Sequence, residues 1–161
     1  EPALVIDTLT RWRERKCQDA SELDWMCRHA LRTLVKQGDE AALSLLGYHS
    51  QPRVSVSNLA LAATTITPGE ALEFSFTITA QADEPLLVDY VIDFVKANGS
   101  TAPKVFKLKQ LAVAAGESVT LRKRHPIKAN VTTFTYYPGE HTLTLQINGQ
   151  HFDSATFLLT M

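Results

Sequence analysis

The stretch ALEFSFTITAQADEPLLVDYVIDFV, residues 71–95, decides the fold. Apolar and polar side chains alternate along both of its halves. The apolar members are Leu72, Phe74, Phe76 and Ile78, followed by Val88, Tyr90, Ile92 and Phe94. Successive side chains of a strand point to opposite faces, so this period of two predicts two strands, each with one buried face.

The same pattern recurs from Pro52 to the end of the chain. Turn signals separate the apolar runs, among them Pro68-Gly69, Pro138-Gly139 and the hairpin dipeptide Asn148-Gly149. The predicted strands are Val54–Leu61, Leu72–Ala80, Leu86–Lys96, Lys104–Leu108, Ser118–Arg124, His141–Asn148 and Phe152–Leu159. Seven short strands in about 110 residues are typical of an immunoglobulin-like or fibronectin-like sandwich.

The first fifty residues show helical spacing instead. Leu4, Leu9 and Trp12 form a weak helical face, which the charged run Arg13–Lys16 follows. A second helix is predicted to start near Ser21, with Asp24 completing a capping-box-like start, and to end at Gly38. Its apolar stripe is Leu23, Met26, Cys27, Ala30, Leu31, Leu34 and Val35. Asp39 is predicted to cap a short third helix that Gly47 stops.

Three such helices cannot bury much core alone, and helix pairs of this length are the unit of solenoid proteins. We therefore expect residues 1–50 to be the end of a helical-repeat array, and residues 51–161 to be the sandwich. A small helical appendage docked on the sandwich is the alternative. The chain starts at Glu1, so we expect a trimmed start or a piece of a longer chain.

Composition excludes several classes of protein. The apolar share of 45% and charged share of 20% are ordinary for a soluble globular protein. No apolar run approaches the roughly 18 residues that span a bilayer, and no signal peptide is visible. Cys17 and Cys27 have no metal-ligand spacing, and we expect reduced thiols. A cytoplasmic location and no membrane contact are therefore expected.

Basic residues concentrate in one segment, Lys96–Lys128, although the whole chain has a net charge of only −1. The segment holds eight basic residues and one acid, Glu117. Such a cluster can attract a polyanion, most commonly nucleic acid. The alternative interpretation is a solvent-exposed strand face that only keeps the domain soluble.

The order of helices and sandwich resembles a known family. The stretch WMCRHALRTLVKQGDEAALSLLGY, residues 25–48, resembles the last helical repeat of bacterial DNA alkylation-repair proteins built from HEAT-like repeats. The stretches DFVKANGS, PKVFKLK and KRHPIK are similar to the sandwich domain of the AlkC-type DNA glycosylases among them. The resemblance covers nearly the whole chain.

The resemblance implies base-excision repair of alkylated DNA. Members remove cationic alkylated bases such as 3-methyladenine and, in the AlkC type, 3-methylcytosine, without flipping the base into a pocket. The implied partners are double-stranded DNA that carries alkylated bases and the upstream helical repeats of the same protein. The family's catalytic carboxylates lie in earlier repeats, so no catalytic residue is assigned to this chain.

Three sets of residues are the candidates for DNA contact. On the second helix a row spaced four apart is formed by Arg28, Arg32 and Lys36, with His29 beside it. A small-polar turn provides Lys96, Asn98, Ser100 and Thr101. Later strands and the residues at their ends provide Lys104, Lys107, Arg122, Lys123, Arg124, His125 and Lys128, of which Lys107, Arg122 and Arg124 are expected to point away from the core. Each set also has an ordinary structural reading, as a solvated face or a hairpin loop, and only a shared sheet would join the strand residues into one basic face.

Other activities find little support. Asp89 and Asp93 share a strand face but lie roughly 13 Å apart, too far for a carboxylate pair. The five histidines are scattered, and no Gly-rich phosphate loop is present, so no metal or small-molecule cofactor is expected. The chain alone is thus not expected to be an enzyme, and a protein-protein interaction module on a helical solenoid is the alternative function.

Overall fold

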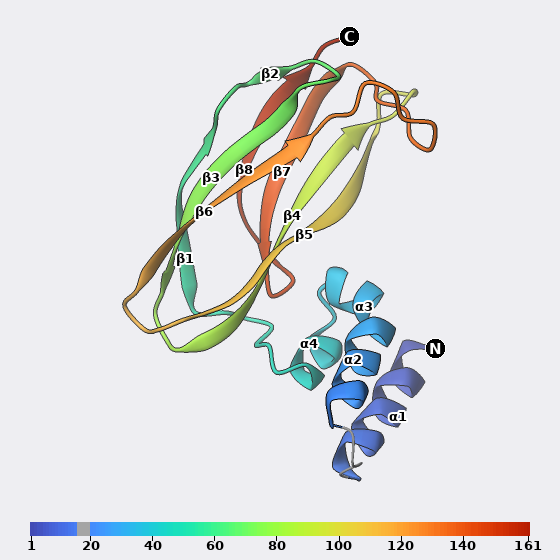
Figure 1. Ribbon diagram of the computed structural model, residues 1–161, viewed down its shortest axis with the longest axis vertical. Helices are drawn as coiled ribbons and strands as arrows, with labels where there is room; N and C mark the ends of the chain where they lie inside the picture. Colours follow the sequence, from blue (N-terminus) through green and yellow to red (C-terminus); the bar gives the residue numbers. More distant parts are fainter. Residues whose placement is uncertain (16–19) are drawn as a thin grey trace.

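The computed structural model describes residues 1–15 and 20–161 and places all helices before all strands (Figure 1). The helices are α1 (Pro2–Glu14), α2 (Ala20–Ala30), α3 (Arg32–Lys36) and α4 (Glu40–Leu45). The strands are β1 (Val54–Leu61), β2 (Thr65–Ile66), β3 (Ala71–Ala80), β4 (Glu84–Val95), β5 (Thr101–Val113), β6 (Ser118–Pro126), β7 (Gly139–Ile147) and β8 (Gln150–Leu159). The predicted mixture of few helices and a mostly β, immunoglobulin-like part is confirmed.

The local signals of the helical part acted largely as predicted. The Asp39 carboxylate accepts a hydrogen bond from the backbone N–H of Ala42 at 2.9 Å, which caps α4. Gly38 takes the left-handed φ of +76° that ends the preceding helix. The predicted second helix is instead divided into α2 and α3, because the backbone at Leu31 leaves helical geometry. Ser21 is not the cap, since α2 already begins at Ala20. Lys16 and Cys17 lie outside the described residues.

The helices bury a small core of their own. Leu9, Cys27, Leu31 and Leu43 are at its centre, and Leu87 of β4 completes it from the sandwich. Several apolar side chains on the outer side of the helices are exposed to solvent. Leu4, Trp12 and Met26, which the spacing assigned to apolar faces, are exposed.

The strands form two sheets. A three-stranded sheet has the order β1-β3-β6, and a five-stranded sheet has the order β2-β8-β7-β4-β5. The eighth strand, β2, was not predicted. It has only two residues and pairs parallel with β8. Strands β5 and β6 are each an edge strand of their sheet. His125 of β6 packs against Phe106 of β5, so these two edges meet in a seam.

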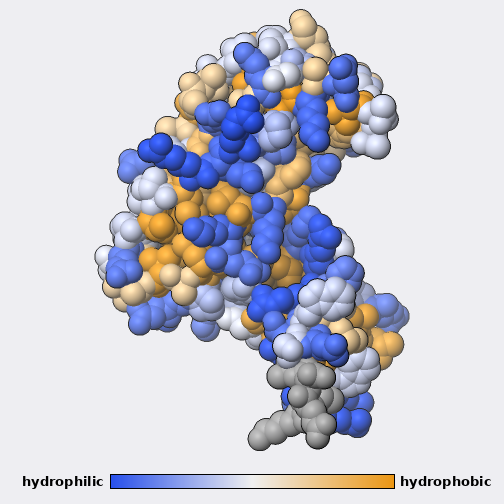
Figure 2. Space-filling view, in the orientation of Figure 1, coloured by the Kyte–Doolittle hydropathy of each residue, from blue (hydrophilic) through white to orange (hydrophobic). Residues whose placement is uncertain are grey.

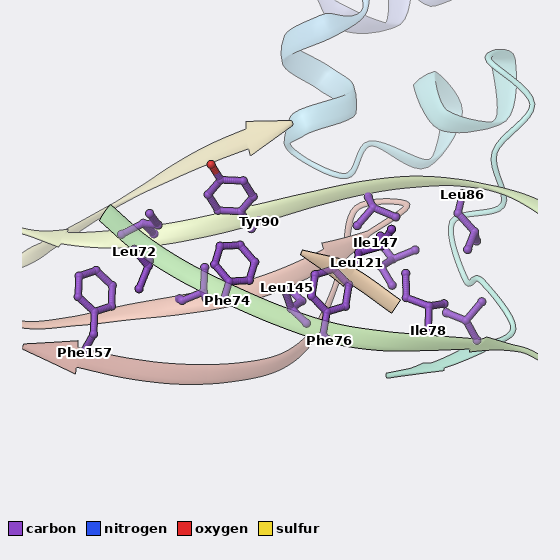
Figure 3. Packing of buried hydrophobic residues seen from close by; sticks show 14 of the residues in the cluster. Leu72, Phe74, Phe76, Ile78, Leu86, Tyr90, Leu121, Leu145, Ile147 and Phe157 are labelled. Atoms are coloured by element: carbon purple, nitrogen blue, oxygen red, sulfur yellow. The ribbon is translucent and has the colours of Figure 1, made fainter. Parts of the chain in front are cut away.

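The two sheets enclose the alternating apolar residues that the opening stretch predicted. Phe74, Phe76 and Ile78 of β3 point toward Tyr90 of β4 and Leu145 of β7 (Figure 3). Phe76 is fully buried, and burying a side chain of this size contributes about 1.5–3 kcal/mol. Phe74 meets Tyr90 edge to face at 5.2 Å between ring centroids, a geometry that aromatic pairs prefer.

The turn between β7 and β8 attaches the helices to the sandwich. Asn148 and Gly149 both have positive φ, as the predicted hairpin dipeptide requires. The buried Asn148 amide accepts from the N–H of Leu87 at 2.7 Å and donates to the carbonyl of His49 at 2.9 Å. These bonds link the hairpin, β4 and the segment that follows α4, so the junction is a packed interface.

Among the described residues, no helix is both long and apolar enough to cross a membrane.

Candidate nucleic-acid interface

A cleft of about 620 Å³ opens where the helices meet β4 and β5. Figure 2 shows a notch between the sandwich and the helical part, with hydrophilic side chains on both of its sides. Its lining comes from α2, α3, the segment after α4, and strands β4 and β5 of the five-stranded sheet. The cleft is thus built from two parts of the chain that are far apart in sequence.

Cations from both parts face this cleft. Arg28, Arg32 and Lys36 come from the helical side, and Lys104 and Lys107 come from β5. All five are among the residues that the sequence analysis proposed for DNA contact. The structure therefore brings together the helix row and part of the strand set, which the sequence alone left unconnected.

Three of these cations also interact within the protein. Arg28 donates to the Asp24 carboxylate at 2.6 Å, and this bond raises the pKa of the guanidinium. Lys36 donates from Nζ to the carbonyl of Val105 at 3.4 Å, which bridges α3 and β5. The Lys104 ammonium lies 5.5 Å from the centroid of the Phe106 ring, within cation–π range.

Arg32 and Lys107 are exposed, and within the described part of the chain neither makes an ion pair or a side-chain hydrogen bond. Phosphate contact by these two side chains would therefore break no ion pair or side-chain hydrogen bond of the described residues.

Asp89 is the carboxylate of the cleft wall. It lies on β4 opposite Lys107 of β5 and Gln146 of β7. Burial raises the pKa of Asp89 to about 6, although the nearby Lys36 and Lys107 ammonium groups act in the opposite direction. The cleft therefore carries one group whose charge changes just below neutral pH. Asp93, four residues on, is half-buried and does not line the cleft.

The predicted polar turn lies at the far end of β4 from the helices, at the top of Figure 1. Lys96, Asn98, Ser100 and Thr101 are all exposed there. The Asn98 side chain accepts hydrogen bonds from the N–H of Ser100 at 3.1 Å and from its hydroxyl at 2.6 Å. Asn98 and Ser100 thus stabilise the turn itself, and the structure does not join this turn to the cleft.

The basic residues of β6 belong to the other sheet. Arg122 and Arg124 point outward from the three-stranded sheet, and Arg124 pairs with Glu73 at 3.1 Å. Lys107 points outward from the five-stranded sheet, so the rows do not form one face. Lys123 is half-buried on the opposite side of β6 from Arg122, and Lys128 is exposed just after the strand.

His125 is a correction to the predicted contacts. Its ring is buried between the sheets, where Nδ1 lies 2.8 Å from the Tyr90 hydroxyl and the Phe106 ring packs at 4.6 Å. Burial lowers the pKa of His125 to about 4, helped by Lys123 and Lys104. A neutral, buried imidazole of this kind packs the core and does not contact a polyanion.

Sequence reasoning missed three aromatic residues of the cleft, Trp25, Tyr48 and Phe106. Trp25 lines it beside His29, and Phe106 lines it from β5. Trp25 falls outside the apolar stripe of its helix, which was a readable sign that its indole does not pack in the helical core. Phe106 falls within the predicted strand Lys104–Leu108, and the strand pattern did not place it in a cleft.

No cluster of three or more His, Cys, Asp or Glu side chains suited to a metal ion occurs in the described ranges.

Comparison with known proteins now defines the class. Residues 55–161 match the family model described as the C-terminal Ig-like domain of the uncharacterised protein YhaZ. The chain therefore belongs to the family of proteins that carry this immunoglobulin-like domain.

Two relatives extend the likeness into the helices. The chain is 40% identical over 134 residues to the uncharacterized protein YhaZ of Bacillus subtilis (strain 168), which covers 83% of this chain and 37% of that protein. It is 36% identical to the Pseudomonas fluorescens alkylpurine DNA glycosylase AlkC, solved bound to DNA containing an abasic site analog, with a TM-score of 0.89. That match covers 100% of this chain and 44% of the glycosylase.

The chain thus spans less than half the length of either relative, and its similarity to AlkC supports the resemblance to AlkC-type proteins. A β-glucosidase from Listeria innocua matches 69% of the chain with a TM-score of 0.54 at 17% identity, which shows a shared sandwich fold alone.

Proposed function

We propose that this chain is the DNA-binding C-terminal region of an AlkC-type alkylation-repair glycosylase. The observation that carries the proposal is the cleft, in which cations from the helical part and from β5 face a common space. A polyanion is the partner that such an arrangement attracts. The likeness to a DNA-bound glycosylase covers the helices as well as the sandwich, so it includes both walls of the cleft.

Residues 1–50 act in this proposal as the end of a HEAT-like repeat array, and residues 51–161 as an immunoglobulin-like domain. The base-removing chemistry belongs to parts of a longer protein, and its substrates are lesions of the 3-methyladenine and 3-methylcytosine class. The support is that this chain corresponds to 44% of AlkC and that no catalytic carboxylate pair was found in its sequence.

Phosphate contact is proposed to run across the cleft. Arg32 on the helical wall and Lys107 on the strand wall are exposed and make no ion pair or side-chain hydrogen bond among the described residues, so they are the strongest candidates. Lys104 and Lys123 extend the positive charge toward the seam between β5 and β6, where both lower the pKa of the buried His125. Neutralising phosphates in this way releases counterions, so affinity should depend steeply on salt.

The outer face of α1 is proposed to receive the preceding helical repeats of the same protein. Leu4 is 65% exposed and Trp12 is 41% exposed on this helix. Apolar side chains of this size gain about 1.5–3 kcal/mol when a neighbouring repeat buries them. The alternative function, a protein-interaction module attached to a solenoid, would instead use such apolar surface for a separate partner.

The test measures binding of a fluorescently labelled DNA duplex over a series of salt concentrations. Replacing Arg32 and Lys107 together by Ala should weaken binding and reduce the salt slope by roughly two, one unit for each lost phosphate contact. Lys109→Ala is the matched control, because Lys109 is an exposed lysine of the same strand that does not line the cleft. Binding that ignores salt, or an equal loss in the control, would favour the interaction module.

A second assay addresses the chemistry. Incubation of the chain with methylated duplex DNA should release no free base above a buffer control. Measurable release that a substitution in this chain abolishes would move the active site into residues 1–161.

A further inference from the structure

Trp25 and His29 form an aromatic platform at the mouth of the cleft. The two residues lie one turn apart on α2, and their rings stack at 5.2 Å between centroids with an interplanar angle of 10°. Trp25 is nevertheless 65% exposed, so most of its surface meets water. A ring that is held in place but open on one face loses little conformational freedom when a second planar group stacks on it.

The rest of the cleft is chemically mixed. Val35, Tyr48, Leu87, Val105 and Phe106 give it apolar walls, and the cations surround them. Contact with phosphates alone needs cations on an exposed surface and gains nothing from apolar walls. A cleft of about 620 Å³ instead lies in the size range of sites that enclose a small planar molecule.

The lining of the cleft thus favours a ligand that is planar and apolar in one part and anionic in the other. A nucleotide with its base out of the stack has this composition. The five cations against the single carboxylate Asp89 favour a phosphate-bearing strand over an acidic or neutral peptide with an aromatic side chain in the same place.

We propose that the cleft binds single-stranded DNA by stacking an unpaired base on Trp25, while Arg28 and Arg32 contact the flanking phosphates. Stacking on an aromatic ring tolerates every base, because each base has a π-face. The base is one from an unpaired segment or strand end, so the lesion base does not have to leave the duplex. This inference rests on the proposed function. It adds single-stranded DNA as a second ligand beside the duplex.

The experiment compares two labelled single strands of equal length, one with bases and one built of abasic units. The two carry the same phosphates, so a difference in affinity reports the bases. The wild-type chain should bind the base-bearing strand at least fivefold more tightly. Trp25→Ala should remove this preference, and Trp25→Phe should keep most of it. Trp12→Ala is the control, because Trp12 is an exposed tryptophan of α1 that does not line the cleft.

Fluorescence gives a second readout that does not depend on affinity. The chain has two tryptophans, so the Trp12→Phe variant emits from Trp25 alone. Saturation with the base-bearing strand should quench this emission, and saturation with the abasic strand should not.

The outcomes separate this inference from the function on which it rests. Equal, salt-dependent affinity for the two strands, or equal quenching by both, would overturn base stacking and leave phosphate binding in place. Loss of binding in Trp12→Ala equal to that in Trp25→Ala would also overturn it. Absence of binding to any oligonucleotide in dilute buffer would overturn the proposed function together with the inference.

Discussion

Gly38 and Gly149 lie backbone against backbone at the junction of the helices and the sandwich. A Cβ added at Gly149 would stand 2.5 Å from the Cα of Gly38, and one added at Gly38 would stand 2.9 Å from the carbonyl oxygen of Gly149. Both glycines also have positive φ. The closeness of the two parts, and with it the width of the cleft, therefore depends on two positions that admit no side chain.

Gly149→Ala should destabilise the chain by about 3 kcal/mol, because it adds a backbone clash to the cost of a left-handed φ. Chemical denaturation measures the change. Gly116→Ala is the matched control, since Gly116 has a φ of +80° and open space around it, and it should cost only about 1–2 kcal/mol. Equal losses in the two variants would mean that the contact between the glycines adds nothing.

Asp89 predicts how DNA binding responds to pH. With a pKa raised to about 6, its carboxylate is ionised at pH 7 and offsets the charge of Lys36 and Lys107. Lowering the pH to 5 removes this negative charge, so binding should tighten by about threefold to tenfold. The comparison is made with Asp89→Asn, which removes this carboxylate and leaves the rest of the cleft lining unchanged. The variant should bind more tightly at pH 7 and lose most of the difference from wild type at pH 5.

The same carboxylate should also affect folding. Its pKa rises from 3.8 in the unfolded chain to about 6 in the fold, so burying the ionised form is unfavourable. The contribution of Asp89 is most favourable below pH 4 and is lost as the pH rises through 6. Asp89→Asn should therefore be more stable than wild type by about 1–2 kcal/mol at pH 7, with the gap closing at pH 4. Thermal unfolding at several pH values measures it, and a gap that widens on acidification would contradict the assignment.

Arg122 and Arg124 test whether the other sheet face also meets DNA. Replacing both by Ala should leave folding nearly intact, because surface changes and exposed ion pairs alter stability by under about 1 kcal/mol. If the duplex reaches this face, the salt slope should fall by roughly one unit per lost contact. Affinity equal to wild type at every salt concentration would restrict the interface to the cleft.

Short sequence patterns correctly predicted the features that depend only on neighbouring residues. The alternation through Phe74 and Phe76, the Asn148-Gly149 hairpin and the Asp39 cap all depend on residues close in sequence, and each holds in the structure. β2 escaped prediction because two residues carry no period, and only the distant β8 pairs with it.

The candidate site shows the same division. Arg28, Arg32 and Lys36 form a readable row, but only the packing of helices on β5 brings Lys107 opposite them. His125 lies in a segment with the pattern of a basic surface. Its ring nevertheless points inward at the seam between β5 and β6 and contacts the Tyr90 hydroxyl. Sheet membership is a long-range property, so the sequence did not reveal that Arg122 and Lys107 face opposite sides.

The seam between β5 and β6 has a consequence for self-association. A free strand edge offers unpaired backbone groups to any second chain, and lysines along the edge are one way in which proteins prevent such pairing. Strand β5 carries Lys104, Lys107 and Lys109 on this free edge. The charges that would attract a nucleic acid should thus also oppose edge-to-edge pairing of two sandwiches, and neutral residues in their place should make β5 more prone to aggregation.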